Sequence, residues 1–126
     1  MLQVTTPLQL YNNADWEQPF LLNSYNPNTN TRAPFDLTAC QLKMTLTSSA
    51  AGVKPFDIST NLGTIIVNTD PTTGQFMVSV PATTMWANLV QGYYNADLLV
   101  FTAPGSVLNV QSFDIEIIAG DTAPTP

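Results

Sequence analysis

The chain has 126 residues, of which 44% are hydrophobic but only 10% are charged, and its formal net charge is −6. A typical soluble domain has about 25% charged residues, so the polar surface of this single-domain-length chain must come mainly from Asn, Thr, Ser and Gln. Three cations, Arg32, Lys43 and Lys54, are too few to neutralise a run of phosphates, which excludes nucleic acid and anionic membranes as partners.

The first elements along the chain are short strand candidates. Residues 2–11 predict an edge strand, because Pro7 cannot donate a ladder hydrogen bond. Residues 19–25 and 63–68 are rich in Leu, aromatic or β-branched side chains. The N-terminus lacks the basic and unbroken apolar segments of a signal peptide, and no apolar run is long enough to span a membrane. We therefore expect synthesis and residence in a cytoplasm before any assembly.

Three later runs alternate apolar and polar residues with period two, namely 41–47, 75–80 and 112–118. Successive side chains of a strand point to opposite faces, so each run predicts a half-buried antiparallel strand. Residues 93–101 predict a fourth strand. The apolar sides of these runs give the predicted core: Leu42, Met44, Leu46, Phe76, Val78, Val80, Tyr94, Leu98, Val100, Phe113, Ile115 and Ile117.

Turns and one helical segment separate these strands. Residues 26–34 have the composition of a loop, and residues 70–74 and 103–105 have turn chemistry. One short helical turn is predicted near residues 82–90. The turn spacing predicts an all-β sandwich of about seven to nine strands over residues 1–119, followed by a Pro/Thr-rich C-terminal tail over residues 120–126.

The usual catalytic groups are missing from the sequence. It has no histidine, a single cysteine, Cys40, and no glycine-rich phosphate loop. Asp114 and Glu116 share one strand face, where they are suited either to calcium or acid–base chemistry or simply to the wet face of an edge strand. The second interpretation is simpler, so we expect no enzymatic activity, no cofactor and no metal.

Two segments, residues 33–49 and 74–100, carry a family resemblance that covers about residues 15–120. In the first, a Pro-x-Asp-Leu-Thr-Gly step leads into a strand, with Ala39 in place of the Gly. In the second, a Gly-x-Tyr-x-Tyr-Asp-Leu step follows a short helical turn, with Ala96 in place of the second Tyr. The matching residues are Pro34, Asp36, Leu37, Thr38, Gly92, Tyr94, Asp97, Leu98 and Val100.

These segments resemble a group of small structural proteins of tailed bacteriophages and prophages. The resemblance implies an immunoglobulin-like sandwich, localisation in the virion after synthesis in the bacterial cytoplasm, and other virion proteins or repeated copies of the chain as partners. It also implies a place at the tail, neck or fibre region, with capsid decoration as an alternative. Its motifs are signatures of a fold rather than of an active site.

The strand 93–101 is apolar on both faces, which raises the question of what covers the second face. The resemblance implies a register in which Tyr94 faces inward, and in that register the side chains of Tyr93, Leu99 and Phe101 point outward. We predict that these three residues contact another protein chain; the rival is cover by residues 26–34 or by the N-terminal segment.

A carbohydrate-binding module is the alternative function, because exposed aromatic rings can hold a glycan. The positions of Trp16, Trp86 and Tyr93 discriminate between the two functions. If two of these residues are exposed in one shallow groove, the carbohydrate-binding function is favoured. If all three are buried, a structural protein is favoured. Core packing is the expected use of Tyr94 and Trp86.

Overall fold

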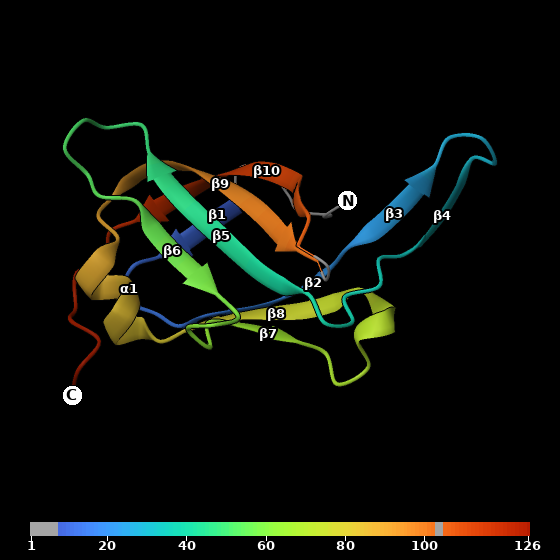
Figure 1. Ribbon diagram of the computed structural model, residues 1–126. Helices are drawn as coiled ribbons and strands as arrows, with labels where there is room; N and C mark the ends of the chain where they lie inside the picture. The colour runs from blue at the N-terminus through green and yellow to red at the C-terminus, as the bar shows by residue number, and fades with distance from the viewer. Residues whose placement is uncertain (1–7, 103–104) are drawn as a thin grey trace.

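Two facing β-sheets make up the body of the protein in the computed structural model, which describes residues 8–102 and 105–126 (Figure 1). The larger sheet has five strands in the order β1-β10-β9-β5-β6, and the smaller has three in the order β2-β8-β7. In chain order these strands are β1 (Leu8–Tyr11), β2 (Trp16–Leu21), β5 (Gln41–Ser48), β6 (Phe56–Ser59), β7 (Ile65–Val67), β8 (Gln75–Val80), β9 (Gly92–Phe101) and β10 (Val107–Ile118). The predicted all-β sandwich is confirmed.

The strand order is that of an immunoglobulin-like sandwich. Such a fold separates strands B, E and D from strands C, F and G, and variable-type domains add C′ beside C. Here β2, β8 and β7 take the places of B, E and D, while β6, β5, β9 and β10 take those of C′, C, F and G. All neighbouring strands are antiparallel except β1, which runs parallel to β10.

A second feature typical of immunoglobulin folds is formed by Tyr94, near the start of β9. Its hydroxyl donates to the backbone carbonyl of Val90 at 3.0 Å and accepts from the amide of the same residue at 3.1 Å. A tyrosine at the start of strand F that bonds back to the preceding backbone is the tyrosine corner of this fold. Tyr94 therefore fixes the path by which the chain enters β9.

The core lies between the two sheets. The ring of Phe20, from the smaller sheet, lies 5.4 Å from that of Phe76 and 6.1 Å from that of Phe113 in the larger sheet. Every residue predicted for the core is buried: Leu42, Met44, Leu46, Phe76, Val78, Val80, Tyr94, Leu98, Val100, Phe113, Ile115 and Ile117. Period-two alternation thus identified the inward face of β5, β8 and β10, and the register taken from the family resemblance identified that of β9.

The helix α1 (Ala82–Asn88) crosses from β8 to β9, where a helical turn is predicted. Met85 and Leu89 are buried, since residues four apart share one helix face. The first amide of the helix, that of Ala82, donates to the carboxylate of Asp15 at 2.7 Å. The cap therefore comes from a residue that is distant in the sequence.

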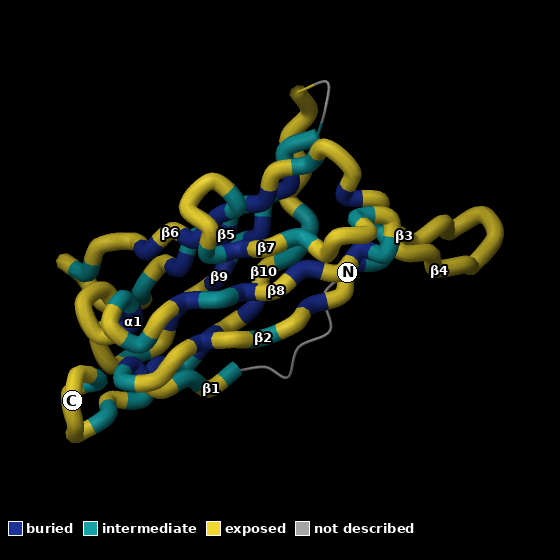
Figure 2. Tube along the Cα trace, turned by 90° about the horizontal axis from the view of Figure 1, so that it is seen from below, coloured by how far each residue is buried: buried dark blue, intermediate teal, exposed yellow. Residues whose placement is uncertain are grey.

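β3 (Asn23–Asn26) and β4 (Thr31–Pro34) form a hairpin outside both sheets, here called the finger (residues 23–34). It projects from one end of the sandwich (Figures 1 and 2). The prediction of a loop over residues 26–34 is therefore wrong in part, because residues 31–34 pair with residues 23–26. The finger points away from β9 and does not cover it, which removes one of the two rivals to a partner.

The N-terminal and C-terminal segments of the described chain contact each other through residues 12–13 and 120–122. β1 is an edge strand, as predicted, although residues 2–7 of that prediction lie outside the described residues; so do residues 103 and 104 of the predicted turn at 103–105. The C-terminal tail lies against residues that follow β1. The side chain of Asn12 accepts from the amide of Gly120 at 2.9 Å, and that of Asn13 donates to the carbonyl of Thr122 at 2.9 Å.

Candidate functional site

The outward face of β9 carries the three residues predicted to contact a partner. The register is as predicted: Tyr94, Ala96, Leu98 and Val100 are buried, and the residues between them face outward. Tyr93 is 57% exposed, whereas Leu99 and Phe101 are half-buried. The strand positions agree with the prediction, and the contact itself stays a prediction.

Neighbouring strands explain why two of these three side chains are half-buried. β9 is the central strand of the larger sheet, so each outward side chain stands between one on β5 and one on β10. Lys43 and Asn109 are directly opposite Leu99. Long polar side chains cover apolar neighbours with their aliphatic stems. Intrachain cover at Leu99 therefore comes from its own sheet and is partial.

Tyr93 lines a shallow depression with a volume of about 710 Å³ at one end of this face. The depression lies across β5, β9 and β10, next to the connection from α1, and its other lining residues are Thr47, Ser48, Ser49, Tyr94, Asn95 and Asp114. The amide of Asn95 donates to the carboxylate of Asp114 at 3.3 Å. This surface combines one accessible aromatic ring with hydroxyl, amide and carboxylate groups.

Phe101 lines a smaller depression, of about 320 Å³, at the other end of β9. Leu62, Lys43 and Asp57 also line it. The ammonium of Lys43 lies 3.7 Å from the carboxylate of Asp57. Both side chains of this ion pair are about half exposed, so it contributes little to stability.

The outward face of the larger sheet is acidic. Asp97 hydrogen-bonds the hydroxyl of Ser112, and Glu116 accepts from the amide of Gln9 at 2.9 Å. Among residues 8–102 and 105–126, neither these two carboxylates nor that of Asp114 has a cation within ion-pair distance. Their partners are neutral, so the negative charge of this face is uncompensated.

Asp114 and Glu116 lie on this face, as predicted, but β10 is not an edge strand. β1 pairs with Ile115–Ile118 along its outer side, so the expectation that these charges protect a sheet edge is wrong at Glu116, whereas Asp114 lies just beyond this pairing. Asp114 bonds Asn95 on β9, whereas Glu116 bonds Gln9 on β1. The two carboxylates therefore turn toward opposite neighbours, and no group of three or more metal-ligating residues occurs within the described ranges.

Cys40 and Asp36 belong to the turn that precedes β5. Asp36 accepts from the hydroxyl of Thr38 at 2.6 Å and from its amide at 2.9 Å, and these two bonds hold the pKa of Asp36 below its ordinary value although desolvation acts in the opposite sense. Partial burial raises the pKa of the Cys40 thiol, and the charge of Asp36 acts in the same sense. A raised pKa keeps the thiol protonated and argues for a small packing residue rather than a nucleophile.

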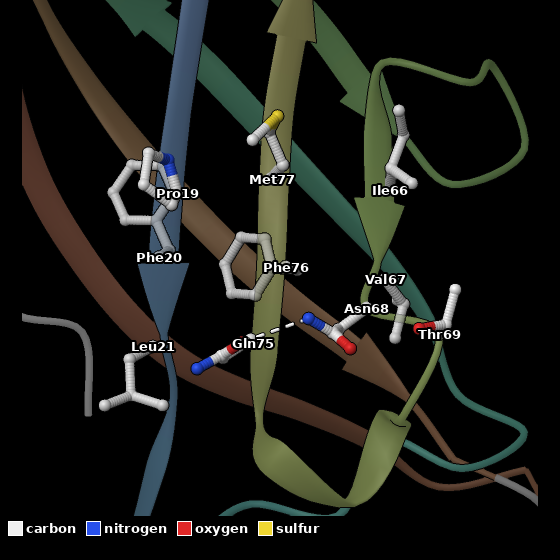
Figure 3. Close-up of a pocket in the computed structure, with 10 residues that line it drawn as sticks. All are labelled: Pro19, Phe20, Leu21, Ile66, Val67, Asn68, Thr69, Gln75, Phe76 and Met77. Carbon is white, nitrogen blue, oxygen red and sulfur yellow. Dashed lines mark hydrogen bonds between the residues drawn. The ribbon is translucent and has the colours of Figure 1, made fainter.

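The outward face of the smaller sheet is apolar, and the sequence analysis missed it. Pro19, Met77 and Ile66 are cross-strand neighbours that form one row over β2, β8 and β7 (Figure 3). Met77 is 40% and Ile66 53% exposed. With Leu21 they line a shallow hollow of about 690 Å³. The signal was in the sequence, because residues 19–22 and 65–67 are consecutive apolar residues, as residues 98–101 are.

The two tryptophans are placed differently. Trp16 is buried, at 2% exposure, and its indole N–H donates to the side chain of Gln18 at 3.1 Å. Trp86 is 41% exposed on α1, so its predicted use as a core aromatic is wrong: Met85 in the helix and Leu89 directly after it are the residues that face the core. Trp86 and Tyr93 are therefore both exposed, but Trp86 does not line the depression at Tyr93.

Comparisons with known proteins add little. No protein-family model and no curated protein matches the chain. Among solved structures it is similar to AggA, the major subunit of aggregative adherence fimbriae type I from Escherichia coli, with 12% sequence identity and a TM-score of 0.40 over 95% of this chain and 93% of that one. A similarity at this level says nothing about function. No helix in the described parts has the length and apolar character to cross a membrane.

Proposed function

We propose that this chain is a non-enzymatic structural protein of a tailed-phage virion, an interaction module that assembles through the outer faces of its sandwich. The observation that carries the proposal is that both outer faces present large apolar side chains to solvent. Tyr93 does so on the larger sheet, and Leu21, Ile66 and Met77 do so on the smaller. With 10% of residues charged, contact with other chains is the natural use of such faces.

The resemblance of residues 33–49 and 74–100 to virion proteins supports the same function. Its residues serve the fold: Asp36 and Thr38 hold the turn before β5, and Tyr94 makes the tyrosine corner. Motifs that maintain a rigid sandwich suit a protein whose task is to present surfaces in a repeated array.

Quantitative mass spectrometry of purified particles from the strain that encodes the chain tests the proposal. We expect the chain in the particles, in a copy number that matches the rotational symmetry of the tail, neck or fibre region. A copy number that matches the capsid lattice supports decoration of the capsid instead. Absence of the chain from particles that contain all other structural proteins contradicts the proposal.

Carbohydrate binding is a second candidate, favoured by the depression at Tyr93. An accessible ring beside the hydrogen-bonded pair of Asn95 and Asp114 offers stacking and polar contacts to a sugar. Titration of the labelled protein with neutral oligosaccharides, followed by NMR, tests it. Binding that Tyr93→Ala abolishes supports this candidate. Turnover of a glycan that Asp114→Asn abolishes contradicts the absence of enzymatic activity.

A further inference from the structure

The finger and the depression at Tyr93 lie at opposite ends of the molecule. β9 begins beside α1, so Tyr93 lies at the α1 end of the larger sheet. The finger projects from the other end, as both views show (Figures 1 and 2). The two surfaces therefore cannot meet within one copy of the chain.

Contacts between its own two strands stabilise the finger. Tyr25 and Arg32 are cross-strand partners, and the guanidinium carbon of Arg32 lies 5.8 Å from the centre of the Tyr25 ring. The hydroxyl of Tyr25 donates to the side chain of Asn30 at 2.8 Å. A two-stranded hairpin is marginally stable alone, and these cross-strand contacts stabilise it. Nearly all its side chains are exposed, so it is ordered without contributing to the core.

The charges of the two surfaces are complementary. Arg32 is one of three cations in a chain with nine carboxylate side chains. Within the described ranges it has no carboxylate at ion-pair distance. The depression contains Asp114, which has only a neutral partner, and Glu116 lies opposite Tyr93 on β10. The finger thus carries an unpaired cation, and the far end of the same molecule carries unpaired anions.

The polar groups of the two surfaces also suit each other. The depression is wide and shallow, with hydroxyl groups of Thr47, Ser48 and Ser49 along one side. The tip of the finger, residues 27–30, consists of Pro, Asn and Thr residues, which offer amides and hydroxyls as hydrogen-bond partners. The exposed ring of Tyr93 supplies an apolar contact within a polar surface, as aromatic residues do in interfaces between proteins.

We propose that the finger of one copy docks in the depression of the next copy, with Arg32 directed toward Asp114. The inference rests on the proposed function, because it names a second copy of this chain as a partner. The contact joins two different surfaces, so it is heterologous and repeats head to tail. Such contacts close into a ring or continue as a filament, depending on the rotation between copies.

Sedimentation velocity of the purified full chain over a range of concentrations tests the contact. We expect concentration-dependent association that weakens as salt is added, because the charges are exposed. Arg32→Glu and Tyr93→Glu should each weaken association about tenfold or more. Arg32→Lys, which keeps the charge, should largely retain it. Thr125→Glu, which adds the same charge as Tyr93→Glu at an exposed position of the C-terminal tail, outside the finger, the depression and the hollow on the smaller sheet, is the matched control and should associate normally.

Mixing the two disrupting variants gives the sharpest result. The Arg32→Glu copy retains an intact depression, and the Tyr93→Glu copy retains an intact finger. A mixture should form a one-to-one pair that grows no further, because the remaining finger and depression both carry an added negative charge. A contact between identical surfaces cannot be restored in this way. Circular dichroism of each variant verifies that the fold is retained.

Several outcomes overturn the inference. One is a wild-type chain that stays monomeric up to about 1 mM, the weakest affinity range of specific contacts. Another is association that Arg32→Glu leaves unchanged. A third is binding of a neutral oligosaccharide in the depression together with unimpaired association of Tyr93→Glu. Phage that carry Arg32→Glu separate the two proposals. If the variant chain is present in particles at the normal copy number, the head-to-tail contact is contradicted but the proposed function is not.

Discussion

Replacing Ala39 with glycine should stabilise the protein. Ala39 has a φ of 58° and is the third residue of a turn closed by a 3.0 Å bond from the amide of Cys40 to the carbonyl of Leu37. Positive φ at this position is the arrangement that favours glycine. A left-handed conformation costs a residue with a Cβ about 1–2 kcal/mol.

The net gain is smaller than that cost, because glycine loses more conformational freedom on folding, about 0.5–1 kcal/mol. We therefore expect Ala39→Gly to raise the free energy of unfolding by about 0.5–1 kcal/mol, or the melting temperature by about 2–5 °C. Urea denaturation monitored by tryptophan fluorescence measures it. Ala87→Gly, at an exposed position inside α1, is the matched control and should destabilise by about 0.5–1 kcal/mol. A loss of stability in both variants refutes the strain at Ala39.

Three further predictions concern β9. Leu98→Ala should lower the free energy of unfolding by about 2–5 kcal/mol, since Leu98 is fully buried; a loss below about 0.5 kcal/mol in urea denaturation contradicts its place in the core. Tyr94→Phe should cost about 1–3 kcal/mol in the same assay, because both backbone groups of Val90 lose their partner, and an unchanged midpoint argues against the tyrosine corner. Phe101→Asp should lower the melting temperature only slightly but abolish incorporation of the chain into particles. If the variant domain unfolds instead, Phe101 is a core residue and the prediction is wrong.

The inward side of the sandwich was predictable because one physical signal determines it. A strand buried on one face alternates with period two, and a shift of one residue would expose the whole apolar set. The runs at 41–47, 75–80 and 112–118 alternate in this way, and the residues on their predicted inward sides are all buried. The helical turn near 82–90 was equally visible, although its cap at Asp15 was not, because a capping contact between distant residues leaves no local pattern.

The elements that the sequence did not reveal are short or polar. β6 has only four residues, two of which are apolar, and β4 has the sequence Thr-Arg-Ala-Pro. Neither contains enough alternation to be distinguished from a loop. The finger is held by cross-strand contacts such as that of Tyr25 with Arg32, which depend on pairing and not on composition.

Period-two alternation does not determine what covers the outward faces of the two sheets. Consecutive apolar residues show that both faces of a strand are apolar, but not what covers the second face. Leu99, in the central strand of the larger sheet, is half-buried beside its neighbours, whereas Ile66, in the edge strand β7, is 53% exposed. The same pattern thus gives different exposure according to a strand's place in its sheet. Strand order must therefore be known before a run such as residues 98–101 or 65–67 can be assigned to a contact with another chain. The exposed row of Pro19, Met77 and Ile66 on the smaller sheet is a better candidate for such a contact than Leu99 is.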